Sequence, residues 1–295
     1  MSNSAIGFIG LGIMGKPMAK NLLKAGYEVY CYDIVAAAVE ETAQAGAHAC
    51  SSIAEVAANV KTIITMLPNS PHVRAVALDA GGLLDSCSEG TLVIDMSSIA
   101  PNASKEIGKA LAEKGIRMLD APVSGGEPKA IDGTLAIMVG GEEADFEEAK
   151  PLFDILGGSA TLVGPLGSGN TCKLTNQVIV AVNIAALAEG LMLAKQAGTD
   201  PQKVYQAIRG GLAGSTVMDA KSLMMLNDNF KPGFRIDLHI KDLNNVLETG
   251  RLTTSPTPLA ASVMQMFLSL SAHGDGKLDH SALWKYYETL ANIDC

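Results

Sequence analysis

The sequence predicts an α/β protein whose N-terminal part is a doubly wound parallel sheet and whose C-terminal part is all helical. Apolar strand-like runs alternate with helical patterns as far as Val163, which is typical of a sheet covered by helices on both faces. The link from Gly164 to Gly169 is rich in glycine and proline, and strand alternation does not return after it. We therefore expect two domains, 1–163 and 164–295, joined by a long helix.

A glycine-rich turn near the N-terminus gives the clearest indication of a ligand. Gly10, Gly12 and Gly15 follow the apolar run Ala5 to Gly10 and open a helical pattern, and Asp33 ends the next strand-like run. Such glycines permit close approach of the backbone to a pyrophosphate, and a carboxylate placed like Asp33 accepts hydrogen bonds from ribose hydroxyls. A purely structural glycine turn is the alternative. The predicted dinucleotide-binding residues here are Gly10, Leu11, Gly12, Ile13, Met14 and Asp33.

The remaining elements follow from apolar periodicity. The predicted strands are Ala5–Gly10, Glu28–Asp33, Thr62–Met66, Thr91–Asp95, Arg117–Ala121, Leu135–Gly140 and Ala160–Val163. The predicted helices of the second domain are Asn170–Ala197, Pro201–Arg209, Ser215–Leu226, Asp237–Leu252, Pro258–Ala272 and His280–Asn292. Ligands of a parallel sheet lie beyond the carboxyl ends of its strands, so the loops after Met66, Asp95 and Ala121 are candidate binding loops.

Composition and charge narrow the class of protein. Of the 295 residues, 48% are apolar and 18% charged, and the net charge of −9 disfavours a general nucleic-acid-binding surface. The apolar run Val178 to Ala194 is interrupted by Asn183 and Glu189, which favours a buried helix over a membrane span. No export signal is evident. We expect a soluble, cytoplasmic enzyme that binds neither nucleic acid nor membrane.

Cysteines and histidines show no metal-binding pattern. The five cysteines are scattered, which is typical of free thiols in a reducing compartment. The five histidines form no cluster with carboxylates or thiolates at useful spacing, so we predict no metal.

Lys173, near the start of the long predicted helix, is a candidate proton donor. Asn176 and Gln177 follow it at three and four residues, so the three side chains share one helix face. A dehydrogenase needs a group that protonates the carbonyl oxygen as hydride arrives, and a lysine ammonium can do so. Spacing alone is equally compatible with a solvated surface lysine.

Three further segments offer binding groups. The loop after Asp120 contains Ser124, Gly125 and Gly126, whose hydroxyl and unobstructed backbone N–H groups can hold a carboxylate, although an ordinary turn has the same composition. Leu67, Pro68 and Ser98 follow strands that flank the expected nicotinamide site, where a helix-capping serine is the alternative. Lys241 heads a later helix and either contacts the cofactor or pairs locally with an acid.

Taken together, these segments resemble the β-hydroxyacid dehydrogenases along essentially the whole chain. The resemblance is carried by the turn Gly7 to Gly15, the loop Asp120 to Pro128 and the stretch Gly169 to Gln177. It implies a Rossmann-type domain joined by a long helix to a helical domain that mediates homo-oligomer contacts, with dimer and tetramer both open.

The resemblance also implies roles for the candidate residues. Lys173 becomes the catalytic acid/base, and Ser124, Gly125, Gly126 and Asn176 hold substrate. Leu67, Pro68, Ser98 and Lys241 join the cofactor-binding residues. The run Asn229 to Leu243 favours tartronate semialdehyde, reduced to D-glycerate, as the substrate. Methylmalonate semialdehyde (the product of a 3-hydroxyisobutyrate dehydrogenase), succinic semialdehyde and glyoxylate remain alternatives, as does a non-catalytic dinucleotide-binding module.

Two positions depart from relatives of this kind. Many carry an arginine directly after the acid that ends the second strand, whereas Asp33 is followed here by Ile34 and Val35. Without a nearby cation for a ribose 2′-phosphate, NAD(H) is expected to be preferred, with NADP(H) possible as the cofactor. Gln177 stands where hydroxyisobutyrate dehydrogenases usually have asparagine.

Overall fold

The computed structural model describes residues 5–292 of the chain. Two compact units follow one another along the sequence: unit 1 extends to Lys173 and unit 2 begins at Leu174. These units are defined by compactness, so the division into functional domains at residue 164 stays a prediction.

Unit 1 is built on a nine-stranded sheet with the order β3-β2-β1-β4-β5-β6-β8-β7, and β9 also pairs with β8. Its strands are β1 Ile6–Ile9, β2 Val29–Tyr32, β3 His48–Ala49, β4 Thr62–Thr65, β5 Leu92–Asp95, β6 Arg117–Asp120, β7 Val123–Ser124, β8 Leu135–Gly140 and β9 Gly157–Gly164. The strand order reverses between β1 and β4, and a crevice at such a reversal is where doubly wound sheets bind ligands.

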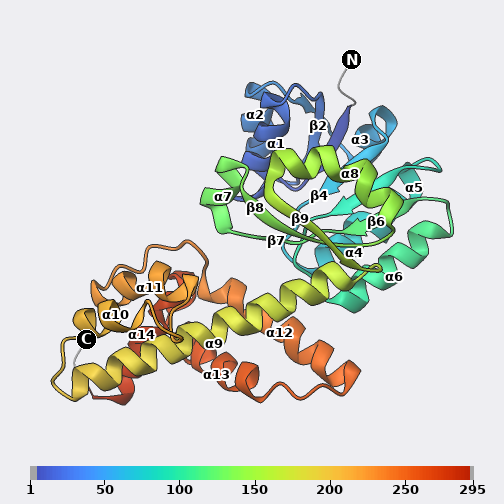
Figure 1. Cartoon of the computed structure of the whole chain (residues 1–295). Coiled ribbons are helices and arrows are strands. Elements are labelled where there is room, and N and C mark those ends of the chain that lie inside the picture. The colour runs from blue at the N-terminus through green and yellow to red at the C-terminus, as the bar shows by residue number, and fades with distance from the viewer. Residues whose placement is uncertain (1–4, 293–295) are drawn as a thin grey trace. The chain divides into compact units, whose positions relative to one another are not determined.

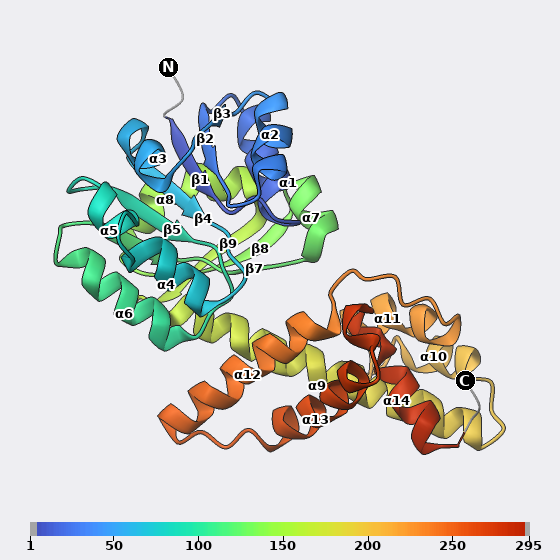
Figure 2. The ribbon, with the colours of Figure 1, turned by 180° about the vertical axis from the view of Figure 1, so that it is seen from behind.

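Helices cover both faces of this sheet (Figures 1 and 2). They are α1 Gly15–Lys24, α2 Ala36–Gln44, α3 Ile53–Asn59, α4 Ser70–Leu78, α5 Leu83–Ser86, α6 Pro101–Ala112, α7 Gly126–Asp132 and α8 Glu143–Leu156. Successive strand residues point to opposite faces, so Phe8 packs into the core under α1 and α8, while Ile9 packs into the core under α3, α4 and α6. The predicted doubly wound fold is confirmed.

Two of the predicted strands, β8 and β9, run against the predicted direction. All seven predicted strands are present, but β8 pairs antiparallel with β6 at Asp120 and Gly140 and antiparallel with β7. The connection from β6 to β8 holds only the short β7 and α7, whereas α8 makes a full crossover that leaves β8 and β9 parallel. The short strands β3 and β7 had no periodicity long enough to predict them.

Unit 2 is helical, as predicted. Its helices are α9 Ser168–Gln196, which begins in unit 1, α10 Pro201–Ile208, α11 Thr216–Leu226, α12 Ile236–Thr253, α13 Pro258–Ala272 and α14 Leu283–Leu290, with the short 3₁₀ turns η1 Asp275–Lys277 and η2 His280–Ala282. Side chains cap helices in both units. Ser52 accepts from the N–H of Glu55, and Ser215 from that of Met218.

Helix α9 is the one helix within residues 5–292 that is long and apolar enough to cross a membrane by length and composition. Ala181, Ile184, Ala188 and Leu191 of this helix are fully buried or nearly so in the core of unit 2. The helix therefore has the packing of a core helix.

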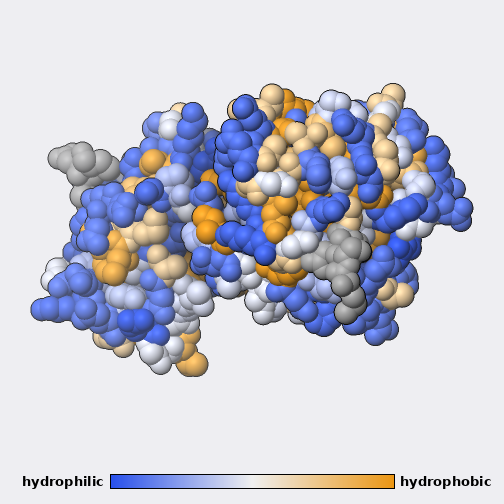
Figure 3. Space-filling view, turned by 90° about the horizontal axis from the view of Figure 1, so that it is seen from above, coloured by the Kyte–Doolittle hydropathy of each residue, from blue (hydrophilic) through white to orange (hydrophobic). Residues whose placement is uncertain are grey.

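One face of the molecule is largely hydrophilic (Figure 3), and the described thiols are free. Hydrophilic residues spread over much of the face seen in Figure 3, with smaller hydrophobic patches between them. The four cysteines of the described residues are free, and Cys295 lies outside them. Burial raises the pKa of Cys31, Cys50 and Cys87 to about 11.

Candidate active site

The glycine-rich turn uses its three glycines for different reasons. Gly10 has a φ of 98°, and a Cβ there would overlap the carbonyl of Met66 at the end of β4. A Cβ on Gly15 would overlap the carbonyl of Gly10, so this glycine lets α1 pack against the turn. A Cβ on Gly12 would meet no atom within 4 Å. Nothing in the protein requires glycine at position 12, so the space beside it suits a group from outside, such as a pyrophosphate.

Asp33 closes the same turn from the end of β2. Its Oδ2 accepts the N–H of Leu11 at 2.6 Å, and its Oδ1 accepts the N–H of Val35 at 2.8 Å. Each carboxylate oxygen keeps a second lone pair that can accept from a ribose hydroxyl. Asp33, Leu11, Gly12 and Ile13 line one end of a groove of about 580 Å³ that continues between α1, α2 and α7.

The loops after β4 and β5 are tied together beside this turn. The N–H of Leu67 donates to Oγ of Ser97 at 2.8 Å, and the hydroxyl of Thr65 donates to Oδ1 of Asp95 at 2.8 Å. Pro68 is exposed just after Leu67, and Ser98 is half-buried after β5. The structure thus places Leu67 and Ser98 in adjacent loops at the carboxyl edge of the sheet.

The predicted substrate loop has a backbone that requires glycine. Gly125 has a φ of 143° and Gly126 a φ of 72°, both outside the range that residues with a side chain adopt readily. Gly125 is exposed, and Ser124 is half-buried at the end of β7. The hydroxyl of Ser124 and the neighbouring backbone N–H groups are therefore suited to an anionic ligand.

Two buried carboxyl groups lie side by side at the ends of β5 and β6. Asp95 and Asp120 are register partners, and both are fully buried. Oδ1 of Asp120 accepts the N–H of Gly167 at 2.7 Å, and Oδ2 accepts the N–H of Asn170 at 2.6 Å. Burial raises the pKa of Asp120 to about 7; the two backbone donors oppose this shift, and the charge of Asp95 adds to it.

Lys173 lies one turn beyond the backbone groups that Asp120 accepts. It is 5% exposed, which contradicts the alternative of a solvated surface lysine. Asn170, on the preceding turn of α9, accepts the N–H of Ile99 at 2.9 Å and donates to Oγ of Ser104 at 3.1 Å. The start of α9 is thus tied by side chains to β6, to the loop after β5 and to α6.

In unit 2, the other predicted polar residues of α9 join α12. Nδ2 of Asn176 donates to Oε1 of Gln177 at 2.8 Å, and Nε2 of Gln177 donates to Oδ2 of Asp242 at 2.5 Å. Lys241 forms an ion pair with Oδ1 of Asp242 at 2.9 Å. The local acid pair that was the alternative for Lys241 is present, and it also connects this lysine to Gln177 and Asn176.

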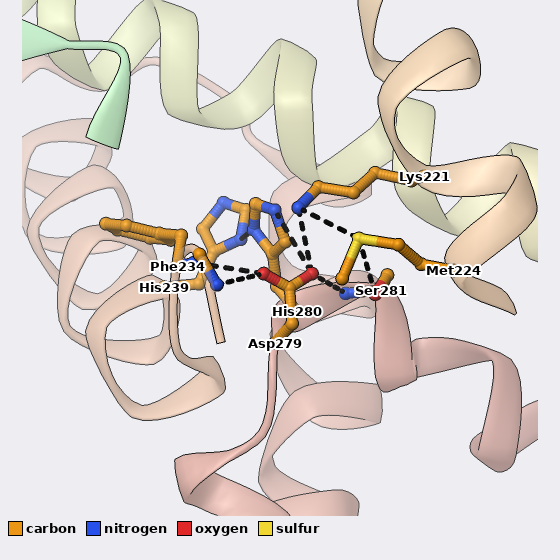
Figure 4. Close-up of polar contacts among 8 residues, drawn as sticks. Lys221, Met224, Phe234, His239, Asp279, His280 and Ser281 are labelled. Carbon is orange, nitrogen blue, oxygen red and sulfur yellow. Dashed lines mark hydrogen bonds and ion pairs between the residues drawn. The ribbon is translucent and has the colours of Figure 1, made fainter. Parts of the chain in front are cut away.

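A second buried aspartate organises the segment that leads into α12 (Figure 4). Oδ1 of Asp279 accepts from Nζ of Lys221 at 2.9 Å and from the N–H of Ser281 at 3.0 Å, and Oδ2 accepts the N–H groups of Gly233 and Phe234 at 2.9 and 3.0 Å. Burial alone would raise the pKa of Asp279. The charges of His280 and Lys221 outweigh this effect and hold the pKa of Asp279 below its usual value.

Two histidines meet beside Asp279. Nδ1 of His280 and Nδ1 of His239 are 3.0 Å apart, and Nε2 of His239 lies 3.3 Å from the carbonyl oxygen of Gln177. A carbonyl accepts only, so Nε2 of His239 carries a proton and Nδ1 of His280 donates to Nδ1 of His239. This pair connects Asp279 with the turn of α9 that holds Gln177.

Sequence reasoning missed the residues that hold the predicted ones. The sequence indicates Asp120 only as the residue before the substrate loop and Asn170 only as the start of a helix. It gives no sign of the contacts of Asp242 or of the pairing of His239 with His280. Their partners lie far apart in the chain, so no local pattern indicates these contacts. Within residues 5–292, no group of three or more His, Cys, Asp or Glu side chains is arranged to hold a metal ion.

Family models match both parts of the chain. The model of the NAD-binding domain of 6-phosphogluconate dehydrogenase matches residues 5–164, and the model described as NAD-binding of NADP-dependent 3-hydroxyisobutyrate dehydrogenase matches residues 167–287. With the fold and the glycine-rich turn, these matches define an NAD(P)-dependent dehydrogenase that acts on a CH–OH group.

Similar proteins place the chain more closely. It is 44% identical to 2-hydroxy-3-oxopropionate reductase of Escherichia coli K12, with 97% of this chain and 98% of the relative covered. It is 41% identical to 2-(hydroxymethyl)glutarate dehydrogenase of Eubacterium barkeri, with 98% and 96% covered. The solved structure of Mycobacterium tuberculosis 3-hydroxyisobutyrate dehydrogenase with L-serine is 32% identical over 97% of this chain and 99% of that one, with a TM-score of 0.92. The chain belongs to the β-hydroxyacid dehydrogenase family.

Proposed function

We propose that this protein reduces tartronate semialdehyde to D-glycerate with NADH. The observation that carries the proposal is the buried Lys173, held one turn into a helix whose start is anchored to the strand that leads into the Ser124 loop. The 44% identity to a 2-hydroxy-3-oxopropionate reductase supports this substrate over the others that relatives accept.

Each predicted residue has a role in the proposed reaction. When bound, NADH supplies a hydride to the carbonyl carbon of the aldehyde. The ammonium of Lys173 gives its proton to the carbonyl oxygen, so that aldehyde, NADH and one proton become alcohol and NAD⁺. Ser124, Gly125 and Gly126 hold the substrate carboxylate, and Asn176 hydrogen-bonds the substrate. Orientation of donor and acceptor is the main contribution of these binding groups.

The cofactor residues fit a dinucleotide with a free ribose. The open space beside Gly12 accommodates the pyrophosphate next to the N–H groups of Ile13 and Met14. Asp33 accepts the ribose hydroxyls and repels a 2′-phosphate, which supports a preference for NADH over NADPH. We further propose that Leu67, Pro68 and Ser98 contact the nicotinamide half and that Lys241 contacts the cofactor.

We also propose a cytoplasmic homo-oligomer. Ile179 and Leu193 on α9 are 57% and 71% exposed, and Leu259 on α13 is 62% exposed. A contiguous exposed apolar surface is typical of a subunit interface, and we propose that these side chains lie in one. Sedimentation of the purified protein measures the assembly.

Replacement of the proposed proton donor tests the mechanism. Lys173→Ala should lower kcat by about two to four orders of magnitude, because it removes general acid catalysis, and should leave the Kd for NADH within a few-fold. The matched control is Lys109→Ala, which removes an exposed lysine of α6 and should behave as wild type. Near-wild-type kcat in Lys173→Ala would refute the assignment.

The substrate is tested by kcat/KM for a panel of aldehydes. Tartronate semialdehyde should be preferred over methylmalonate semialdehyde, succinic semialdehyde and glyoxylate, and NADH over NADPH. A different preferred aldehyde would overturn the substrate and leave the mechanism standing. NADH binding without turnover of any aldehyde would favour a non-catalytic dinucleotide-binding protein.

A further inference from the structure

The proposed reaction uses Lys173 but does not explain what fixes its position. Helix α9 begins with Ser168 and Gly169, preceded by Gly167, and the first N–H groups of a helix need acceptors from outside it. Asp120 supplies both of its carboxylate oxygens to this start, one to the N–H of Gly167 and one to that of Asn170. A side chain 47 and 50 residues away therefore replaces the usual local capping residue.

The backbone at this contact is shaped to let the helix approach Asp120. A Cβ on Gly140 of β8 would overlap Oδ1 of Asp120, and a Cβ on Gly169 would overlap the backbone carbonyl of Asp120. Both positions therefore require glycine for the carboxylate and the helix start to meet.

Asp120 also begins the segment that holds the predicted substrate loop. Ser124 follows it by four residues, and the intervening Ala121, Pro122 and Val123 are all buried. On the other side, Lys173 follows Asn170 by three residues and so lies on the same side of the helix, one turn further on. Asp120 thus connects the carboxylate-binding loop with the helical turn that carries the proposed proton donor.

We propose that Asp120 is a positioning residue that sets the separation between Lys173 and the Ser124 loop by capping α9. The proposal deepens the proposed function and rests on it, since it gives Lys173 the role of proton donor. Asp120 touches neither substrate nor cofactor in this assignment. A displacement of about 1 Å in reacting groups can lower a rate about 100-fold, so an anchor at this point affects kcat directly.

Asp120→Asn is the most direct test. Asparagine matches aspartate in shape, but its Nδ2 is a donor and cannot accept the N–H of Gly167 or of Asn170, so one capping bond is lost. We expect kcat for tartronate semialdehyde to fall about 10- to 100-fold, while the Kd for NADH, measured by fluorescence, stays within about twofold.

The matched control separates positioning from stability. Asp145 is also a buried aspartate and pairs at 2.6 Å with Arg117, at the opposite end of β6 from Asp120. Asp145→Asn should lower the melting temperature and leave kcat unchanged. If Asp120→Asn lowers the melting temperature but keeps wild-type kcat, Asp120 is merely structural and the proposal fails.

A second variant covers the case in which Asp120→Asn does not fold. Gly169→Ala keeps the carboxylate but pushes the start of α9 away from β6, so kcat should again fall with the Kd for NADH preserved. Wild-type kcat in Gly169→Ala would overturn the proposal. The Lys173→Ala enzyme distinguishes the two hypotheses: if it stays active, the proposed function fails, and if it is inactive while the Asp120 and Gly169 variants are active, only the positioning role fails.

Discussion

Asp120 in unit 1 and Asp279 in unit 2 are both fully buried, and both accept backbone N–H groups from a segment distant in sequence. Their pKa values move in opposite directions. Asp279 has Lys221 and His280 as cationic neighbours, and its pKa is lowered. Asp120 has the carboxyl of Asp95 beside it and only backbone donors as partners, and its pKa is raised to about 7.

The difference shows that burial does not by itself decide whether the pKa of a carboxyl group is raised or lowered. A buried carboxylate with a cation is a stable anchor, because removing either partner leaves the other uncompensated. When a buried carboxyl beside another carboxyl ionises, it loses hydration and is repelled by its neighbour. Groups with pKa values shifted in this way cluster at functional sites. Asp279 holds the segment before α12, whereas Asp120 holds the turn proposed to carry the proton donor.

The largest expected effect on stability comes from Asp279→Ala. The change leaves Lys221, whose side chain is 15% exposed, without its buried partner and also removes the acceptor of three backbone N–H groups. The free energy of unfolding, measured in urea, should fall by about 3–5 kcal/mol. A loss below about 1 kcal/mol would show that Asp279 contributes little to stability, and would contradict its role as a more stable anchor than Asp120.

The pH dependence of stability gives the second prediction. A carboxyl whose folded pKa is raised stabilises the folded state below its unfolded pKa, and this stabilisation is lost as the pH rises through the folded pKa. The ordinary pKa of an aspartate is 3.8 and the folded pKa of Asp120 is about 7, so the window is about pH 4 to 7. Across this window the stabilisation lost is about 4 kcal/mol.

Asp120→Asn removes this titration, so wild type should lose up to about 4 kcal/mol relative to the variant between pH 4 and 7. Urea denaturation at several pH values in this window measures the difference. A difference that is constant with pH would mean that the folded pKa of Asp120 is not raised. The pKa of Asp279 is shifted in the opposite direction, so the stabilisation by Asp279 is lost only as the pH falls into more acidic solution.

The smallest effect is expected for an exposed carboxylate. Glu41 of α2 contacts Nζ of Lys16 at 2.6 Å and Nζ of Lys20 at 2.8 Å, and these hydrogen bonds lower its pKa to about 2. Its direction of shift matches that of Asp279, but its side chain is 47% exposed. Glu41→Gln should leave the urea midpoint nearly unchanged, because water and salt screen exposed pairs. A large loss would show that cation pairing, not burial, determines the stability of such anchors.

The sequence predicted most of the fold because its signals are local. Strand runs such as Ala5 to Gly10 and the helix Pro258 to Ala272 have strong apolar periodicity, and both are present. The reversed direction of β8 was not predictable in the same way. Strand direction depends on whether a connection crosses the sheet, and the segment between β6 and β8 has the length of a crossover but contains the short α7.

The glycines of the site were predictable from the sequence, whereas the residues that hold the site in place were less so. The turn at Gly10 is specified by a backbone conformation that few other residues adopt, so the requirement is visible in the sequence. Asp120 and Asn170 act through partners that lie dozens of residues away, and nothing in their neighbourhood in the chain reveals those partners. The buried polar contacts are therefore the part of the site that the sequence alone does not predict.

The cap on α9 also bears on how the chain folds. Its hydrogen bonds join residues 47 and 50 positions apart, and closing a loop of such length has an entropic cost that delays these contacts. The apolar middle of α9 can become helical early, but its first turn gains its acceptors only when β6 and β8 have paired. The Lys173 turn is thus expected to reach its native geometry late, so recovery of activity on refolding should lag behind recovery of helical content.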